Sequence, residues 1–300
     1  MNLSIRAKAA LALIVVGFLG GIAPLLMKIA LKEFSSIQIV FVRFGLASIF
    51  ITPLLIHHLK SVSIKKFVIA LPAGLLFSGN IIFMVIGLQF TTSIVTQLFY
   101  LLTPVFVSVI AYIAFKDKIS IRRVISMIIC FSGSALLILR SIEDSTLISS
   151  IGTIKGNLLI IAAVSCWSLY AVYSKWMSTK IEPTFFMVSN FLTAFVIATL
   201  TLVLTNTSIQ GTIILLTQSS LPTFLSLVSL SIFNSVIFFF LYQWSLKRVS
   251  AFIVTSSAYL SPLSTALFAI PFFGERLSGV LLMSAASIFL GSYLILTEKK

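Results

Sequence analysis

Residues 88–139 and 246–297 repeat each other at a constant offset of 158 residues, without a gap. The matches that shared apolar composition does not explain are Pro104 with Pro262, Asp117 with Glu275, Lys118 with Arg276, Ser126 with Ser284 and Gly133 with Gly291. An odd number of membrane-length apolar segments separates the copies, so they cross a bilayer in opposite directions. This inverted duplication is typical of secondary transporters, whose substrate site lies near the midplane between the repeats.

The composition requires a lipid environment. The chain of 300 residues is 59% hydrophobic and only 9% charged, which leaves too little polar surface for a soluble globule. A hydrocarbon core of about 30 Å needs about 20 apolar residues per helix. We therefore predict an all-α polytopic membrane protein with ten transmembrane helices in two inverted five-helix repeats, near residues 10–31, 36–56, 66–88, 92–114, 122–139, 156–177, 184–205, 222–245, 250–273 and 279–297.

The division between the halves is predicted at the only sizeable polar connection, RSIEDSTLISSIGTIKG. The predicted organisation is a first five-helix repeat over 1–140, a connecting loop over 141–155 and a second five-helix repeat over 156–300. The front parts of the halves match more weakly, with Lys28 falling on Lys175 at an offset of 147. With five helices per repeat, these lysines are expected at opposite faces of the membrane.

The net charge of +14 is distributed as the positive-inside rule predicts. With the amino terminus in the cytoplasm, fourteen of the 21 basic residues fall on the cytoplasmic side and four on the other, while Lys28, Arg43 and Lys175 lie within helices. The sequence therefore predicts a multi-pass protein with both termini cytoplasmic. The excess charge orients helices beside a lipid bilayer, and we expect no nucleic-acid partner.

Several segments carry a resemblance to a known family. They are PLLMKIA, SSIQIVFVRFGLASIF, LTPVFVSVIAYIAFKDKIS, YQWSLKRVSA and YLSPLSTALFAIPFFGERLS. Across essentially its whole length the chain resembles the drug/metabolite transporter superfamily, specifically its ten-helix EamA-type members. The resemblance implies a transporter of small metabolites, in bacteria commonly an inner-membrane exporter of amino acids or other metabolites. The family's substrates vary too widely to imply one here.

The charged residues limit how transport is energised. All seven acidic residues lie in loops or at helix ends, at Glu33, Asp117, Glu143, Asp144, Glu182, Glu275 and Glu298. The absence of a carboxylate at mid-membrane disfavours coupling through a buried Asp or Glu. Lys28 and Lys175 either attract an anionic substrate at two gates or extend to the nearby interface. Arg43 either faces the cavity or bonds to exposed carbonyls of a neighbouring helix.

Polar side chains at bilayer depth are the remaining site candidates. An unsatisfied amide in hydrocarbon is costly, so these groups are expected to face the protein interior. There they either bind substrate or bond one helix to another. The predicted substrate-binding set is Asn80, Gln97, Tyr100, Trp167, Tyr170, Asn234, Tyr242, Tyr259, Lys28 and Lys175, with Pro104 and Pro262 as hinges. Asn80, Tyr100 and Trp167 are preferred because helices 3, 4 and 6 line the cavity in the family that the chain resembles.

Catalysis fits the sequence poorly. His57 and His58 are the only histidines and lie in a basic loop, and the chain carries no metalloprotease or metal-diphosphate motif. Cys130 and Cys166 lack metal-ligand spacing, so we expect no metal, no cofactor and no enzyme. The predicted function is a secondary carrier of small polar metabolites, foremost an amino-acid exporter, acting as a monomer or homodimer. The alternatives are uptake or exchange of an anionic metabolite such as a nucleotide or sugar phosphate, and a channel or structural scaffold.

Overall fold

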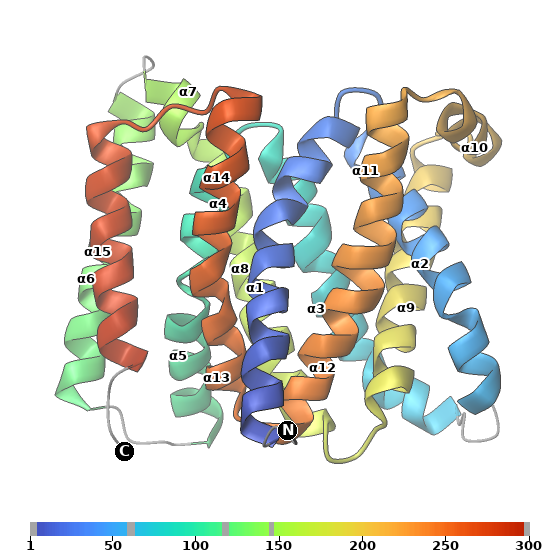
Figure 1. Ribbon diagram of the computed structural model, residues 1–300, viewed down its shortest axis with the longest axis horizontal. Helices are drawn as coiled ribbons and strands as arrows, with labels where there is room; N and C mark the ends of the chain where they lie inside the picture. The colour runs from blue at the N-terminus through green and yellow to red at the C-terminus, as the bar shows by residue number, and fades with distance from the viewer. Residues whose placement is uncertain (1–4, 59–63, 116–119, 144–146, 297–300) are drawn as a thin grey trace.

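The protein is a helical bundle. The computed structural model describes residues 5–58, 64–115, 120–143 and 147–296, and all regular secondary structure in these ranges is helical. Seven helical segments in the described chain are long and apolar enough to cross a membrane, and shorter apolar stretches in α2, α6 and α15 run alongside them (Figure 1). The prediction of an all-α polytopic membrane protein is confirmed. Asp117, Lys118, Asp144 and Glu298 lie outside the described residues.

The helices follow the predicted segments closely. In the first half they are α1 (Ile5–Ala30), α2 (Ser36–His58), α3 (Ile64–Leu88), α4 (Ser93–Tyr100), α5 (Thr103–Phe115) and α6 (Ile121–Glu143). In the second half they are α8 (Ile154–Met177), α9 (Pro183–Leu204), α11 (Leu221–Ser231), the π-helix η3 (Ile232–Ile237), α12 (Phe238–Arg248), α13 (Ala251–Thr255), the 3-10 helix η4 (Ser256–Leu260), α14 (Ser261–Phe273) and α15 (Gly279–Leu296). Two short helices, α7 (Ile148–Ile151) and α10 (Ile209–Gln218), lie in the connections.

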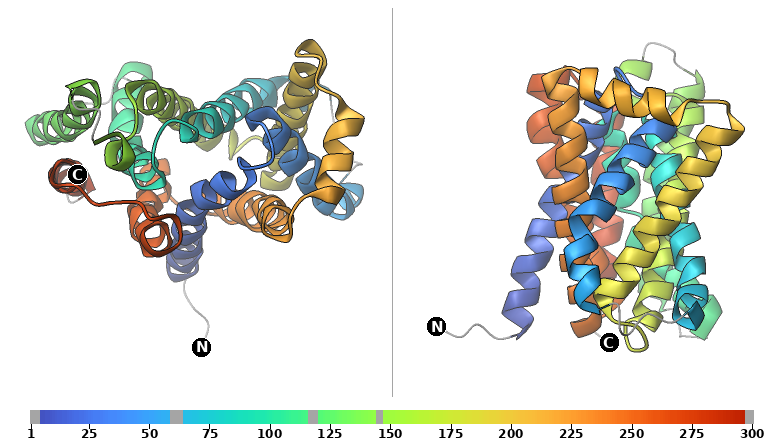
Figure 2. Two further views of the ribbon diagram at one scale, coloured as in Figure 1. Left: turned by 90° about the horizontal axis from the view of Figure 1, so that it is seen from above. Right: turned by 90° about the vertical axis from the view of Figure 1, so that its right-hand side faces the viewer.

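The bundle has two distinct ends (Figure 1). We call the end where α1 begins and α15 finishes the terminal end, and the end that carries α7 and α10 the loop end. Seen from above, α6 and α15 form a pair at one edge of the molecule (Figure 2). Lys28, near the end of α1, therefore lies at the loop end, and Lys175, near the end of α8, lies at the terminal end.

Both predicted hinge prolines stand at breaks between helical segments. Pro104 is the second residue of α5, which begins after α4 has ended at Tyr100, and Pro262 is the second residue of α14, directly after η4. The first turn of a helix tolerates proline because its N–H groups lack intrahelical partners. The sequence predicts each proline inside one continuous helix. In the structure a new helical segment begins one residue before each proline, at Thr103 and at Ser261.

The packing of α6 against α15 relates the two repeat copies. A Cβ added to Gly133 would lie 2.8 Å from the carbonyl oxygen of Ser284, and one added to Gly291 would lie 2.6 Å from that of Ser126. The repeat pairs Gly133 with Gly291 and Ser126 with Ser284, so each copy's glycine meets the other copy's serine. Two copies related by a two-fold axis produce reciprocal contacts of this kind.

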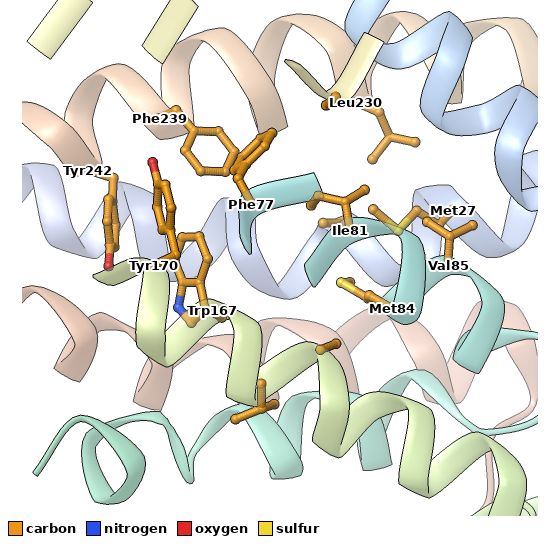
Figure 3. Packing of buried hydrophobic residues seen from close by; sticks show 14 of the residues in the cluster. Met27, Phe77, Ile81, Met84, Val85, Trp167, Tyr170, Leu230, Phe239 and Tyr242 are labelled. Atoms are coloured by element: carbon orange, nitrogen blue, oxygen red, sulfur yellow. The ribbon is translucent and has the colours of Figure 1, made fainter. Parts of the chain in front are cut away.

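Aromatic side chains fill the centre of the bundle (Figure 3). The fully buried ring of Phe77 packs edge to face on Phe239 with ring centroids 4.8 Å apart, and also contacts Phe44 and Phe191. Aromatic pairs of this geometry stabilise a core beyond the area that they bury. The cluster joins α2 and α3 of the first half to α9 and α12 of the second, and its member Phe239 lines the cavity described next.

Candidate functional site

A cavity lies between the two halves. Its walls come from α1, α2, α3 and α4 of the first half and from α8, η3, α12 and the segment from α13 to α14 of the second. Most of the lining is aliphatic or aromatic, including Met27, Met84, Phe238 and Phe239. A mostly apolar cavity with a few polar groups is typical of a small-molecule site.

Six of the ten predicted substrate-binding residues line this cavity: Asn80, Gln97, Tyr100, Trp167, Asn234 and Tyr242. The other four do not line it. Tyr170 lies behind Trp167, Tyr259 packs on Phe289 with ring centroids 6.3 Å apart, and Lys28 and Lys175 lie toward opposite ends of the bundle.

The amide side chains bond neighbouring helices at the cavity wall. Asn80 Nδ2 donates to the Tyr100 hydroxyl and, at 2.9 Å, to the carbonyl of Ala163. Gln97 Nε2 donates to the carbonyl of Gly20 at 3.0 Å. Asn234 Nδ2 donates to a carbonyl of α1. The amide donors therefore serve the helix-to-helix bonding that the sequence left as an alternative to ligand binding.

Two polar oxygens at the wall lack a hydrogen-bond partner in the described part of the chain. They are Oδ1 of Asn234 and the hydroxyl of Tyr242, on side chains that are 3% and 1% exposed. Both residues line the cavity. Because an unpaired buried polar group is costly, these atoms are positioned to bond a polar group of a bound molecule.

Stacked rings support the aromatic wall (Figure 3). Trp167 stacks on Tyr170 with centroids 5.3 Å apart and an interplanar angle of 25°, and it lies 5.0 Å from Tyr242. The Tyr170 hydroxyl accepts hydrogen bonds from Asn190 Nδ2 at 3.0 Å and Gln243 Nε2 at 2.6 Å. Tyr170 thus orients Trp167 from behind the wall, and Asn190 and Gln243 bond helices to each other.

Arg43 also lines the cavity, although the predicted binding set omits it. Its side chain is 2% exposed, Nε donates to Ser235 Oγ at 2.9 Å and one terminal nitrogen donates to the carbonyl of Asn234 at 2.8 Å. The other terminal nitrogen, Nη1, has no hydrogen-bond partner among the described residues. The π-helix η3 carries both acceptors. A lone arginine inside a membrane-length apolar segment was the available sequence signal.

An ion pair joins three segments at the loop end of the bundle. Lys28 Nζ lies 2.9 Å from Glu275 Oε1, and the Glu275 side chain is 5% exposed. The same carboxylate accepts the backbone N–H groups of Ser93 at 2.7 Å and Ile94 at 3.0 Å, the first two residues of α4. A carboxylate at a helix N-terminus also interacts favourably with the helix dipole. Glu275 thus joins the connection after α14 to both α1 and α4.

A second hollow lies beside this ion pair. Met27 lines the central cavity, whereas its neighbour Lys28 lines a wider hollow at the loop end together with Lys32, Gln89 and Phe273.

The corresponding lysine at the terminal end has different partners. Lys175 Nζ donates to the carbonyl of Leu246 at 2.6 Å and to that of Val249 at 2.8 Å, at the end of α12. A cation at a helix C-terminus is stabilised by the carbonyls that lack intrahelical partners. Lys28 and Lys175 are thus both helix-end contacts, and only Lys28 is paired with a carboxylate in the described structure.

Comparison with known proteins identifies the family. The model of the EamA-like transporter family matches residues 7–139 and 154–297. The chain belongs to the EamA-like transporter family. The resemblance to the drug/metabolite transporter superfamily is thereby confirmed, and the chain is a membrane transporter by family.

Relatives of this EamA-like transporter agree with that assignment. An "Uncharacterized transporter" of Methanothermobacter thermautotrophicus is 25% identical over 293 residues, covering 89% of this chain and 82% of the relative. The "Uncharacterized transporter YyaM" of Bacillus subtilis is 30% identical over 139 residues, or 44% of each protein. A solved crystal structure covers 96% of both chains with a TM-score of 0.67 and 16% identity, which shows a shared fold.

Proposed function

We propose that this EamA-like transporter is an alternating-access carrier that exports small polar metabolites, foremost amino acids, across a bacterial inner membrane. The observation that carries the proposal is the central cavity between the two halves, together with the Lys28–Glu275 ion pair at the loop end of the bundle. A channel requires a continuous path when open, whereas a carrier closes one end of its site at a time. In this proposal the ion pair closes the loop end.

The orientation rests on charge. Basic residues gather at the terminal end, at Lys8, Lys65, Lys66, Arg122, Lys180, Lys247 and Arg248, whereas Lys32, Arg140, Lys155 and Arg276 lie at the loop end. By the positive-inside rule the terminal end faces the cytoplasm, which places both termini there. The state described here is then closed toward the outside.

The two ranges that the family model matches, 7–139 and 154–297, support a division into five-helix repeats over 1–140 and 156–300. In this proposal the helix breaks at Pro104 and Pro262 act as equivalent hinges of the two repeats. A helix break lacks the continuous backbone hydrogen bonding that stiffens a helix, so bending is least costly there.

Uptake or exchange of an anionic metabolite is the second candidate function. It is favoured by the hollow at the loop end, where Lys32 is exposed and no acidic side chain is among the described lining residues. Such a hollow would concentrate anions outside the ion pair.

Cysteine accessibility tests the carrier proposal without knowledge of the substrate. Ala258, which lines the cavity, is replaced by cysteine in a chain whose Cys130 and Cys166 are replaced by serine. A membrane-impermeant maleimide is added to right-side-out or inside-out vesicles. We expect fast labelling from the cytoplasmic side and slow labelling from the outside. Matched Lys180→Cys and Lys32→Cys variants, exposed at the terminal end and at the loop end, report maleimide activity in inside-out and right-side-out vesicles, respectively.

Equal fast labelling of Ala258→Cys from both sides would contradict a carrier and favour a channel. Preferential labelling from the outside would retain the carrier but reverse the assigned orientation.

A further inference from the structure

The cavity contains a buried positive charge that the described protein does not neutralise. Arg43 donates to two neutral acceptors and lies over the ring of Phe44, with its Cζ 5.1 Å from the ring centroid. None of the described residues that line the cavity is acidic. Placing an arginine in a low-dielectric interior is costly unless an anion compensates for its charge.

We infer that Arg43 binds the carboxylate of a small, otherwise largely apolar substrate through its free Nη1 group. This inference rests on the proposed carrier function and specifies its substrate class. The η3 acceptors fix the rest of the guanidinium of this cavity-lining residue and leave Nη1 as its unpaired donor. Hydrogen bonds between ionised partners are about twice as strong as neutral ones.

The cavity favours a monoanion over a phosphate. Arg43 is its only cationic lining residue in the described ranges, because Lys28 and Lys175 lie outside it and hold other partners. One guanidinium compensates a carboxylate, whereas a phosphate dianion retains an unpaired charge in an apolar site. The remaining lining, with Trp167 and Phe238, matches an apolar or aromatic body.

The unpaired oxygens of Asn234 and Tyr242 supply the second polar contact. Both can accept a hydrogen bond, so they suit an amino, amide or hydroxyl group on the body of the substrate. The three orphaned groups, on Arg43, Asn234 and Tyr242, then have partners in a single bound molecule.

Matched probes test the inference on the purified full-length protein by isothermal titration. Phenylacetate carries the proposed carboxylate on an apolar body, phenylacetamide has the same shape without charge, and phenyl phosphate carries the other anion. We expect phenylacetate to bind at least about tenfold more tightly than phenylacetamide, as befits a charged hydrogen bond. We also expect it to bind more tightly than phenyl phosphate. Equal binding of phenylacetate and phenylacetamide, absent binding of phenylacetate, or preference for phenyl phosphate would overturn the inference.

Variants locate the effect at Arg43. Arg43→Gln should lose about tenfold or more in phenylacetate affinity and leave phenylacetamide binding unchanged, while Arg43→Lys retains part of the preference. Lys247→Gln, which removes an exposed cation at the terminal end, is the matched control and should bind as the parent does. Unchanged phenylacetate affinity in Arg43→Gln would also overturn the inference.

Thermal unfolding of each variant shows whether it is folded. If Arg43→Gln does not fold, the phenylacetate and phenylacetamide pair on the parent protein and on Arg43→Lys still decides the matter. One-sided labelling of Ala258→Cys is independent of any substrate. One-sided labelling combined with no carboxylate preference would therefore reject the role of Arg43 and leave the carrier intact.

Discussion

The loop end and the terminal end of the bundle carry related lysines with unlike partners. Lys28 pairs with the buried carboxylate of Glu275, which also binds the first N–H groups of α4. Lys175 instead donates to two carbonyls at the end of α12. A carrier built from two copies of one fold can be open to only one side of the membrane when its two halves differ in conformation. The unlike partners of the two lysines are such a difference.

The largest effect is expected from breaking the ion pair at the loop end. Glu275→Gln removes the charge that holds both Lys28 and the N-terminus of α4. Loss of one partner of a buried pair costs about 3–5 kcal/mol, and we expect about 2 kcal/mol here because the Lys28 side chain is 21% exposed. Labelling of Ala258→Cys from the outside should then accelerate by roughly thirtyfold.

The matched control for this prediction is the exposed pair at the terminal end. Glu182 lies 3.7 Å from Lys247, with side chains that are 63% and 45% exposed. Loss of a surface pair usually costs less than about 1 kcal/mol. Glu182→Gln should therefore change the labelling rate of Ala258→Cys only slightly. If Glu275→Gln labels no faster from the outside than Glu182→Gln does, the ion pair does not close the loop end.

The next largest effect is expected at the reciprocal glycine contacts between α6 and α15. Gly133→Ala and Gly291→Ala place a methyl group against backbone carbonyl oxygens at 2.8 and 2.6 Å, so each should lower the free energy of unfolding by about 1–3 kcal/mol. Thermal unfolding in detergent measures the loss. The two losses should be similar because the contacts are reciprocal.

Gly279→Ala is the control for steric overlap, because a Cβ added at this position would have no heavy atom of the described structure within 4 Å. We expect the substitution to be neutral or slightly stabilising. A loss at Gly133 without one at Gly291 would show that the two copies pack differently against each other.

The hydropathy of the sequence was sufficient to predict an all-α polytopic membrane protein and the opposite placement of Lys28 and Lys175. Apolar runs of fixed length have few alternatives in a bilayer, so these features depend on local composition alone. The polar part of the cavity lining was also partly predictable, because polar groups at bilayer depth have to face the interior. Six of the ten predicted residues line the cavity for this reason.

The specific partners were not predictable. Glu275 follows Gly274 in a connection that reads as surface, and its partner Lys28 lies 247 residues away. Only the folded bundle brings the two together. Arg43 had two open interpretations, and the structure combines them, since the π-helix η3 binds part of the guanidinium while Nη1 remains at the cavity. A π-helix depends on tertiary packing and leaves no clear mark in an apolar sequence.

A smaller effect is expected at the terminal end. Lys175→Gln keeps an amide donor that can still reach one carbonyl, so we expect it to cost about 1 kcal/mol, as for one hydrogen bond. Labelling of Ala258→Cys from the cytoplasmic side should change by only a few fold. Lys28→Gln, measured in parallel from the outside, should have the larger effect because it leaves a buried carboxylate without its cation. Equal effects of the two variants would mean that the contacts of Lys28 and Lys175 contribute equally at the two ends.

The smallest effect is a pH dependence confined to the loop end. Glu33, in the connection from α1 to α2, accepts hydrogen bonds from the hydroxyls of Ser220 and Thr223 and from the backbone N–H of Ser220 at 3.0 Å, which tie it to the start of α11. These bonds, foremost that of the Ser220 hydroxyl, lower the pKa of Glu33 in the folded state. The ionised form is thus the one that folding favours. Its contribution to stability is present above the pKa of the unfolded chain and is lost as the pH falls through the lowered folded pKa.

Thermal unfolding between about pH 7 and about pH 3 measures this contribution, since an unperturbed glutamate titrates within that range. The parent protein should exceed Glu33→Gln in melting temperature at neutral pH, and the difference should shrink as the pH falls. Glu182→Gln, at the terminal end, should run parallel to the parent over the same range. Because Glu33 is exposed, solvent screening keeps its contribution small. A pH-independent difference between parent and Glu33→Gln would show that the hydrogen bonds hold Glu33 equally well when it is protonated.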